Sequence, residues 1–136
     1  MKDFEDLNKS KNVVKKLNSN LSKDEIISEA FKLHSKGNIP EAVKYYQYFL
    51  AKGYQDHRVF WNYGVILKNL SKIKEAEKFV KKTIEIKPDF FTAYVLLGII
   101  MRDLNRLEDA EEFTRKAIEI EPSHSNAYAN LGLILK

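Results

Sequence analysis

The sequence contains no cysteine, only three prolines and five glycines among its 136 residues, and no long hydrophobic run. The lack of cysteine excludes disulfides, thiolate metal ligands and a cysteine nucleophile. No window approaches the roughly 18 apolar residues of a membrane-spanning helix, and the first residues carry acids where a signal peptide is apolar. We therefore expect a cytoplasmic protein without a membrane partner.

The positive charge of the chain is concentrated at its beginning. The formal net charge is +4, but residues 1–23 hold six lysines against three acids, and the remainder holds 17 bases and 16 acids. A nucleic-acid-binding protein carries its basic stripe on the folded body. The composition therefore predicts no nucleic-acid partner.

An internal repeat of 34 residues organises the rest of the chain. The stretch FWNYGVIL at 60–67 aligns with YVLLGIIM at 94–101 and with YANLGLIL at 128–135. EAEKFVKKTIEIKP at 75–88 aligns in the same way with DAEEFTRKAIEIEP at 109–122. A fainter copy precedes them, so we predict repeats at 23–56, 57–90 and 91–124 and a half repeat at 125–136.

Each repeat has the apolar spacing of two helices. The break between them carries Gly37, Ser71 or Asn105, and glycine and asparagine tolerate the left-handed conformation that ends a helix. A capping box at Ser22–Glu25 marks the beginning of regular structure, so residues 1–22 are predicted to be a polar leader, flexible or partly helical. Pro88 and Pro122 end second helices, and Asp89 or Ser123 is expected to cap the next helix.

The repeated pattern of an aromatic residue, Leu-Gly, Ala, an aromatic residue or Thr, Ala-Ile and Pro resembles the tetratricopeptide repeat. Departures are Glu29, Tyr54, and Val80 with Thr114. The resemblance implies an all-α fold of about seven helices, a right-handed superhelix of helical hairpins whose first helices line a concave groove. It also implies that small residues let the paired helices approach closely, Gly64 against Ala76 and Gly98 against Ala110.

The resemblance further implies a protein-protein interaction scaffold that binds a peptide segment or a helix of a partner in this groove. The register places the following residues in the groove: Phe31, Arg58, Trp61, Asn62, Val65, Lys68, Asn69, Leu96, Ile99, Arg102 and Asn130. Trp61 and Ile99 have an alternative interpretation as packing between successive first helices. Asn62 and Asn130 share one repeat position, where some related superhelices use asparagines to bond a peptide backbone. The carboxylate clamp of chaperone-binding members is not expected, because Ile27, Phe31, Thr92 and Leu96 stand where it needs Lys, Arg or Asn.

No constellation for catalysis accompanies the repeats. The three histidines, His34, His57 and His124, lack metal-ligand spacing, and the acid pairs Glu108-Asp109 and Glu111-Glu112 open a helix, where they favour its N-terminal dipole. We expect no enzyme activity, no catalytic residue, no metal and no cofactor within these residues.

The half repeat supplies a first helix without a second helix to cover it. We expect Leu131, Ile134 and Leu135 to contact a neighbouring copy in a homo-oligomer, or the chain to be a fragment of a longer protein. The alternatives to a free-standing scaffold are therefore the N-terminal scaffold of a larger enzyme, such as a glycosyl- or sulfotransferase, and a self-assembly module.

Overall fold

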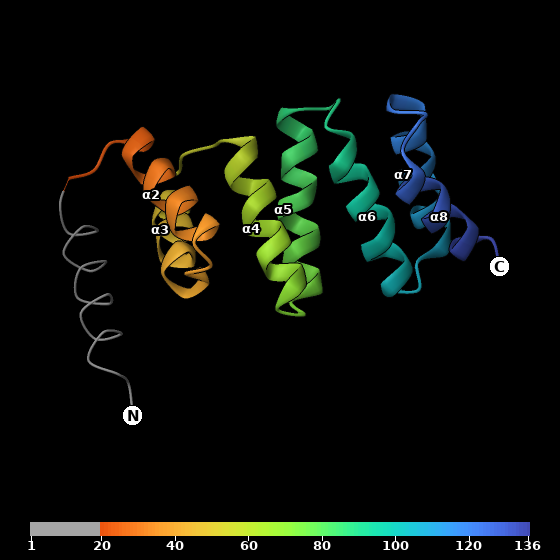
Figure 1. Ribbon diagram of the computed structural model, residues 1–136, viewed down its shortest axis with the longest axis horizontal. Helices are drawn as coiled ribbons and strands as arrows, with labels where there is room; N and C mark the ends of the chain where they lie inside the picture. Colours follow the sequence, from red (N-terminus) through yellow and green to blue (C-terminus); the bar gives the residue numbers. More distant parts are fainter. Residues whose placement is uncertain (1–19) are drawn as a thin grey trace. The chain divides into compact units, whose positions relative to one another are not determined.

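The computed structural model describes residues 20–136, and this part of the chain contains seven α-helices and no strand (Figure 1). The expected all-α class is thus confirmed. Most of the predicted leader, residues 1–19, lies outside the described residues. Within the described part, every helix is too short or too polar to cross a bilayer.

The chain divides into two compact units, of which the first ends at Gln55. Its hairpin consists of α2 (Lys23–Ser35) and α3 (Ile39–Ala51). Ser22 caps α2 with the predicted capping box, since its side chain accepts from the Glu25 backbone while the Glu25 side chain accepts from the Ser22 backbone. The core of this unit includes Ile26, Ala30, Ala42, Tyr45 and Phe49, all at most 1% exposed.

The second unit, Asp56–Lys136, contains five helices. These are α4 (His57–Asn69), α5 (Ile73–Ile86), α6 (Phe91–Asp103), α7 (Leu107–Ile120) and α8 (Ser125–Ile134). Helices α4 and α5 form one antiparallel hairpin and α6 and α7 the next, while α5 also packs on α6 (Figure 1). Helix α8 contacts α7 and α6, so first helices and second helices alternate along this unit.

The turns inside the three hairpins share one backbone conformation. Gly37, Ser71 and Asn105 have φ of 80°, 63° and 59°, and they lie 34 residues apart. Among the residues described, Ser71 and Asn105 are the only non-glycine residues with positive φ. The predicted left-handed breaks are confirmed.

The expected caps after the prolines are wrong. Phe90, not Asp89, occupies the N-cap of α6 and gives no side-chain bond. His124, not Ser123, caps α8, with its Nδ1 accepting from the Ala127 backbone at 3.3 Å. Asn38, Lys72 and Arg106 occupy the N-caps of the second helices, with ψ between 66° and 74° and no side-chain cap bond. Lys72 and Arg106 have no acceptor to offer, and the Asn38 amide does not make the bond that its type allows.

The glycines of the first helices do allow close approach, but the partner differs from the expected alanine. A Cβ built on Gly64 would meet Val80 Cγ2 at 2.9 Å. One on Gly98 would overlap Thr114 Oγ1 and meet Asn130 Nδ2 at 3.1 Å, with the Ala110 carbonyl only at 3.4 Å. The contact therefore lies one helical turn beyond Ala76 and Ala110, at the position that Val80 and Thr114 share.

Candidate functional site

Helix α4 divides into a buried face and a half-exposed face. Phe60, Tyr63 and Leu67 are at most 6% exposed, in the hairpin that α4 makes with α5. On the other side, the side chains of the predicted groove are half-buried or exposed: Trp61, Asn62, Val65 and Lys68 are half-buried, and Arg58 and Asn69 are exposed. The helical spacing thus places the residues that pack in the hairpin on one face of α4 and the solvent-accessible residues on the other.

Helix α6 repeats this division at equivalent positions. Leu96, Ile99 and Arg102 are half-buried, and they lie 34 residues after Asn62, Val65 and Lys68 respectively. We call these six residues the first-helix stripe. The structure brings them onto corresponding faces of two helices in one compact unit.

Trp61 combines packing with exposure. Its ring meets Phe90, the N-cap of α6, edge-on, with centroids 5.3 Å apart and an interplanar angle of 85°. His57 meets the same ring at 5.9 Å, and Lys87 Nζ lies 5.7 Å from its centroid. The alternative interpretation of Trp61 as a contact between repeats is therefore correct for one edge of the indole, while the side chain remains partly accessible.

Arg58 is engaged by the residue that caps its own helix. Its Nη2 and Nε donate to the Asp56 carboxylate at 2.8 and 3.0 Å, and its backbone donates to the same group at 2.9 Å. Burial alone would raise the Asp56 pKa, but the hydrogen bonds and charge of Arg58, with His57 nearby, outweigh it and lower the pKa. The Arg58 charge is thus largely balanced, which reduces its role in the predicted groove.

Asn130 does not lie on an open surface as expected. Its side chain is 3% exposed, and its Nδ2 donates to Thr114 Oγ1 at 3.0 Å. Its Oδ1 accepts a hydrogen bond from Arg102 Nη1, so both ends of the amide are used inside the protein. The amide is unavailable to a peptide backbone because it satisfies buried partners. Sequence reasoning missed this because the shared repeat position predicts one role for Asn62 and Asn130, whereas Asn62 is half-exposed and Asn130 is buried.

Phe31 belongs to the first unit. It is half-buried and its ring lies 6.4 Å from that of Tyr46. His34, one turn further along α2, shares a hydrogen bond with Tyr46 between Nδ1 and the hydroxyl at 2.9 Å. Burial lowers the His34 pKa below its ordinary value.

The residues expected to mediate self-association are placed unequally on α8. Leu135 is 57% exposed and Leu131 is half-buried, but Ile134 is only 7% exposed and belongs to the core. Tyr128, which the prediction omitted, is 49% exposed. Its equivalence to Phe60 and Tyr94 in the 34-residue register was the signal that could have found it.

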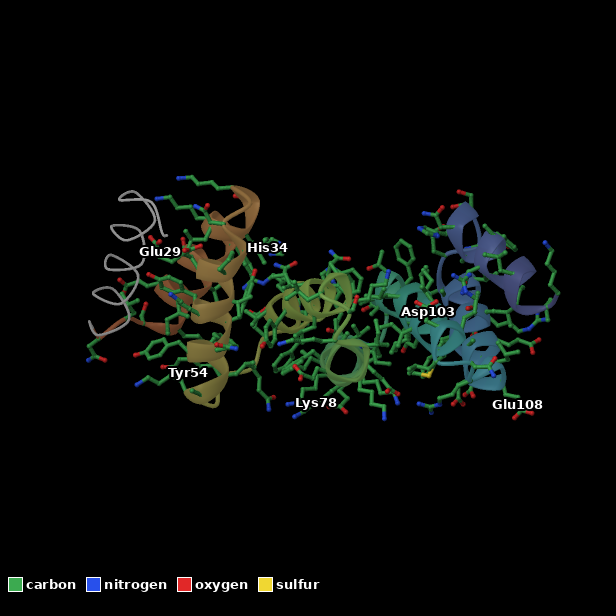
Figure 2. All side chains as sticks on the ribbon, turned by 90° about the horizontal axis from the view of Figure 1, so that it is seen from below. Glu29, His34, Tyr54, Lys78, Asp103 and Glu108 are labelled. Atoms are coloured by element: carbon green, nitrogen blue, oxygen red, sulfur yellow. The ribbon has the colours of Figure 1, made fainter. Side chains whose placement is uncertain are left out.

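The charged side chains of the second unit lie mostly on its surface. Among residues 20–136, no three His, Asp or Glu side chains are placed to hold a metal ion. Lys78 on α5 and Glu108 on α7 are exposed, and Figure 2 shows both at the edge of the second unit. Arg106 instead ties the hairpins together, contacting Glu77 at 2.9 Å and Asp109 at 2.7 Å. Arg106 thus forms surface ion pairs with Glu77 and Asp109. Hydrogen bonds to Asp109 and Glu77 hold the Arg106 pKa above its usual range.

Comparison with protein families decides the identity of the repeat. The family model for the tetratricopeptide repeat matches residues 57–90 and 91–124, half of the chain. The chain belongs to the tetratricopeptide repeat family. In a comparison with curated proteins, no significant match is found.

Solved tetratricopeptide repeat structures share the fold at low sequence identity. MamA has a TM-score of 0.80 at 17% identity, covering 98% of this chain and 84% of MamA. YrrB, described as having an unusual peptide-binding site, has a TM-score of 0.78 at 18% identity, with coverage of 94% and 70%. The first repeat domain of Spaghetti (RPAP3), bound to the HSP90 peptide SRMEEVD, has a TM-score of 0.74 at 19% identity, with coverage of 85% and 94%. The helical-hairpin fold of superhelical type is therefore confirmed.

Proposed function

We propose that this chain is a non-catalytic interaction scaffold that binds a peptide segment of a partner protein along the first-helix stripe. The observation that carries the proposal is the repetition of half-exposed side chains at three equivalent positions of α4 and α6. An apolar and amide surface beside a partly exposed tryptophan is the composition of a peptide anchor point. We retain the repeats predicted at 23–56, 57–90, 91–124 and 125–136 as the working division of this domain.

Similar proteins support this direction. Two structures with the same fold hold chaperone peptides, the RPAP3 domain with SRMEEVD and the second human RPAP3 domain with the HSP70 peptide SGPTIEEVD. In this chain, Thr92 and Leu96 stand where the chaperone clamp needs Lys, Arg or Asn, so we expect a different peptide. We expect Asn62 and Val65 of the stripe, together with the neighbouring Trp61, to make the first contacts.

A random peptide library displayed on phage tests the proposal. The wild-type chain should select peptides whose binding, measured by fluorescence anisotropy, is lost in Trp61→Ala/Asn62→Ala and weakened in Asn62→Ala alone. The matched control is Lys74→Ala/Lys78→Ala on α5, which should bind as wild type. Circular dichroism must show unchanged helicity, since Trp61 also packs on Phe90. Failure to select any peptide, or equal loss in the α5 control, would contradict the proposal.

Self-association is a second candidate, and one observation favours it. Phe60, Leu67, Tyr94 and Met101 are at most 8% exposed, whereas their equivalents on α8, Tyr128 and Leu135, are 49% and 57% exposed. Exposed apolar patches of this kind mark interaction sites. Sedimentation over a range of concentrations should show a dimer that Tyr128→Ser/Leu135→Ser abolishes, and a monomer at every concentration would remove this candidate.

A further inference from the structure

Arg102, at the end of the stripe on α6, is held by a buried side chain. Its Nη1 donates to Asn130 Oδ1, and Asn130 is 3% exposed. The Asn130 orientation is unambiguous because arginine only donates. Asn130 Nδ2 in turn donates to Thr114 Oγ1 at 3.0 Å, and Thr114 Oγ1 donates to the Ala110 carbonyl at 2.7 Å. Three bonds thus connect the guanidinium to the backbone of α7.

The preceding repeat serves as an internal comparison. Thirty-four residues before Arg102, Thr114 and Asn130 lie Lys68, Val80 and Leu96. One repeat therefore has a lysine and two apolar residues at these three positions. The next repeat has an arginine and two polar residues there. Buried polar groups cost free energy unless they are hydrogen-bonded. Packing alone therefore does not explain why Thr114 and Asn130 stand where the preceding repeat has Val80 and Leu96. Thr114 and Asn130 instead hold the planar guanidinium of Arg102 in place. A guanidinium can bind a carboxylate through two parallel hydrogen bonds.

The guanidinium retains donors for a ligand. The Arg102 side chain is 28% exposed, and among the described residues it donates one hydrogen bond. The Asp103 carboxylate lies 4.0 Å from Nη2, which is beyond hydrogen-bonding distance. The Arg102 side chain is therefore partly accessible from solvent.

The charges on the first helices of this unit favour an anion at this point. Helices α4 and α8 contain no Asp or Glu within their bounds, and α6 contains only Asp103, whereas α5 and α7 carry several acids each. Lys68 lies at the same repeat position as Arg102. An acidic peptide segment along the stripe therefore meets the bases Lys68 and Arg102 and the acid Asp103.

We propose that Arg102, positioned by Asn130, binds a carboxylate of the peptide segment, so that the stripe selects acidic partners. The carboxylate comes from an Asp or Glu side chain of the segment. Asn130 is a positioning residue, because it reaches the ligand only through Arg102. This inference rests on the proposed function and adds the chemical class of the partner.

The test uses peptides selected from the random library on the wild-type chain. Each selected peptide is synthesised with its acids changed one at a time to amides, and with a free or amidated C-terminus. We expect Asp and Glu to be enriched, and one acid-to-amide change to weaken binding about tenfold, in line with a charge-assisted hydrogen bond. Arg102→Gln should bind the acidic and the amide peptide equally, while Lys74→Gln, on the exposed side of α5 and outside the stripe, should retain the preference.

The variant Thr114→Val/Asn130→Leu separates positioning from stability, since it installs the apolar pair of the preceding repeat. It should remain helical and bind the amide peptide as wild type, but lose several-fold of the preference for the acidic peptide. Loss of the preference on changing one acidic side chain identifies the bound carboxylate, whereas loss only on amidating the C-terminus overturns the assignment to a side chain.

Two outcomes overturn the inference in different ways. Selected peptides without acidic enrichment, or an unchanged preference in Arg102→Gln, refute it while the proposed function stands. Failure to select any peptide refutes the proposed function and this inference with it.

Discussion

At the scale of single residues, three equivalent helix glycines have different surroundings. Gly98 lies against Thr114 and Asn130, Gly64 against a Val80 methyl, and nothing lies within 4 Å of a Cβ on Gly132. Alanine at a helix interior gains up to about 1 kcal/mol over glycine. The surroundings therefore decide the sign of a substitution.

We predict that Gly132→Ala stabilises the chain by about 0.5–1 kcal/mol, while Gly98→Ala destabilises it by about 1–3 kcal/mol through overpacking. Urea unfolding of both variants and of Gly64→Ala, expected between them, measures the difference. Adding Thr114→Ala to Gly98→Ala should recover part of the loss. Equal effects at Gly98 and Gly132 would contradict the contact.

His34 gives a pH-dependent contribution to stability. Burial lowers its pKa in the folded state below the ordinary 6.5, so the unfolded chain takes up a proton first as the pH falls. The contribution is therefore complete above about pH 6.5 and is lost as the pH falls from there through the folded pKa. Urea midpoints between pH 8 and 5 should fall less in His34→Gln than in the wild type. Parallel curves for the two proteins would show that His34 contributes nothing.

At the scale of elements, the hairpin turns are the clearest success of sequence reasoning. The 34-residue register placed the break of each hairpin, and the left-handed φ follows at Gly37, Ser71 and Asn105. The caps were less predictable, because whether a side chain reaches the first free N–H depends on the ψ of the N-cap. Asn38, a good capping residue, makes no such bond at ψ 66°.

We predict that Ser71→Gly stabilises the α4–α5 hairpin, since a left-handed non-glycine residue costs about 1–2 kcal/mol and the gain is partly offset by the entropy of glycine in the unfolded chain. Asn105→Gly should change stability less, because asparagine tolerates this conformation. The reverse change, Gly37→Ser, should be destabilising. Thermal unfolding of the three variants tests the order, and a destabilised Ser71→Gly would contradict it.

At the scale of the whole molecule, the repeats of the second unit depend on their neighbours for burial. Helix α8 covers α6 and α7, with Ala127 fully buried and Asn130 bonded to both helices. In repeat proteins, stability is approximately a sum of repeat terms and interface terms. The last helix is therefore expected to stabilise the hairpin before it.

We predict that a chain ending at residue 124 remains helical but unfolds at lower urea concentration and with a smaller m-value, because less surface is buried. The full chain with Leu135→Ser is the control and should change little, since this side chain is already 57% exposed. An unchanged midpoint in the shortened chain would show that α8 does not stabilise α6 and α7.

The sequence by itself determined the repeat period, the helical hairpins and the left-handed turns, because these follow from apolar spacing and local backbone preferences. It also placed Trp61, Asn62 and Val65 together on the side of α4 that is half-exposed. Only the tertiary structure decided that Asn130 is buried while Asn62 is accessible, and that Gly98 meets Thr114 rather than Ala110. These outcomes depend on which side chains from separate helices meet, and equivalent positions with different partners acquire different roles.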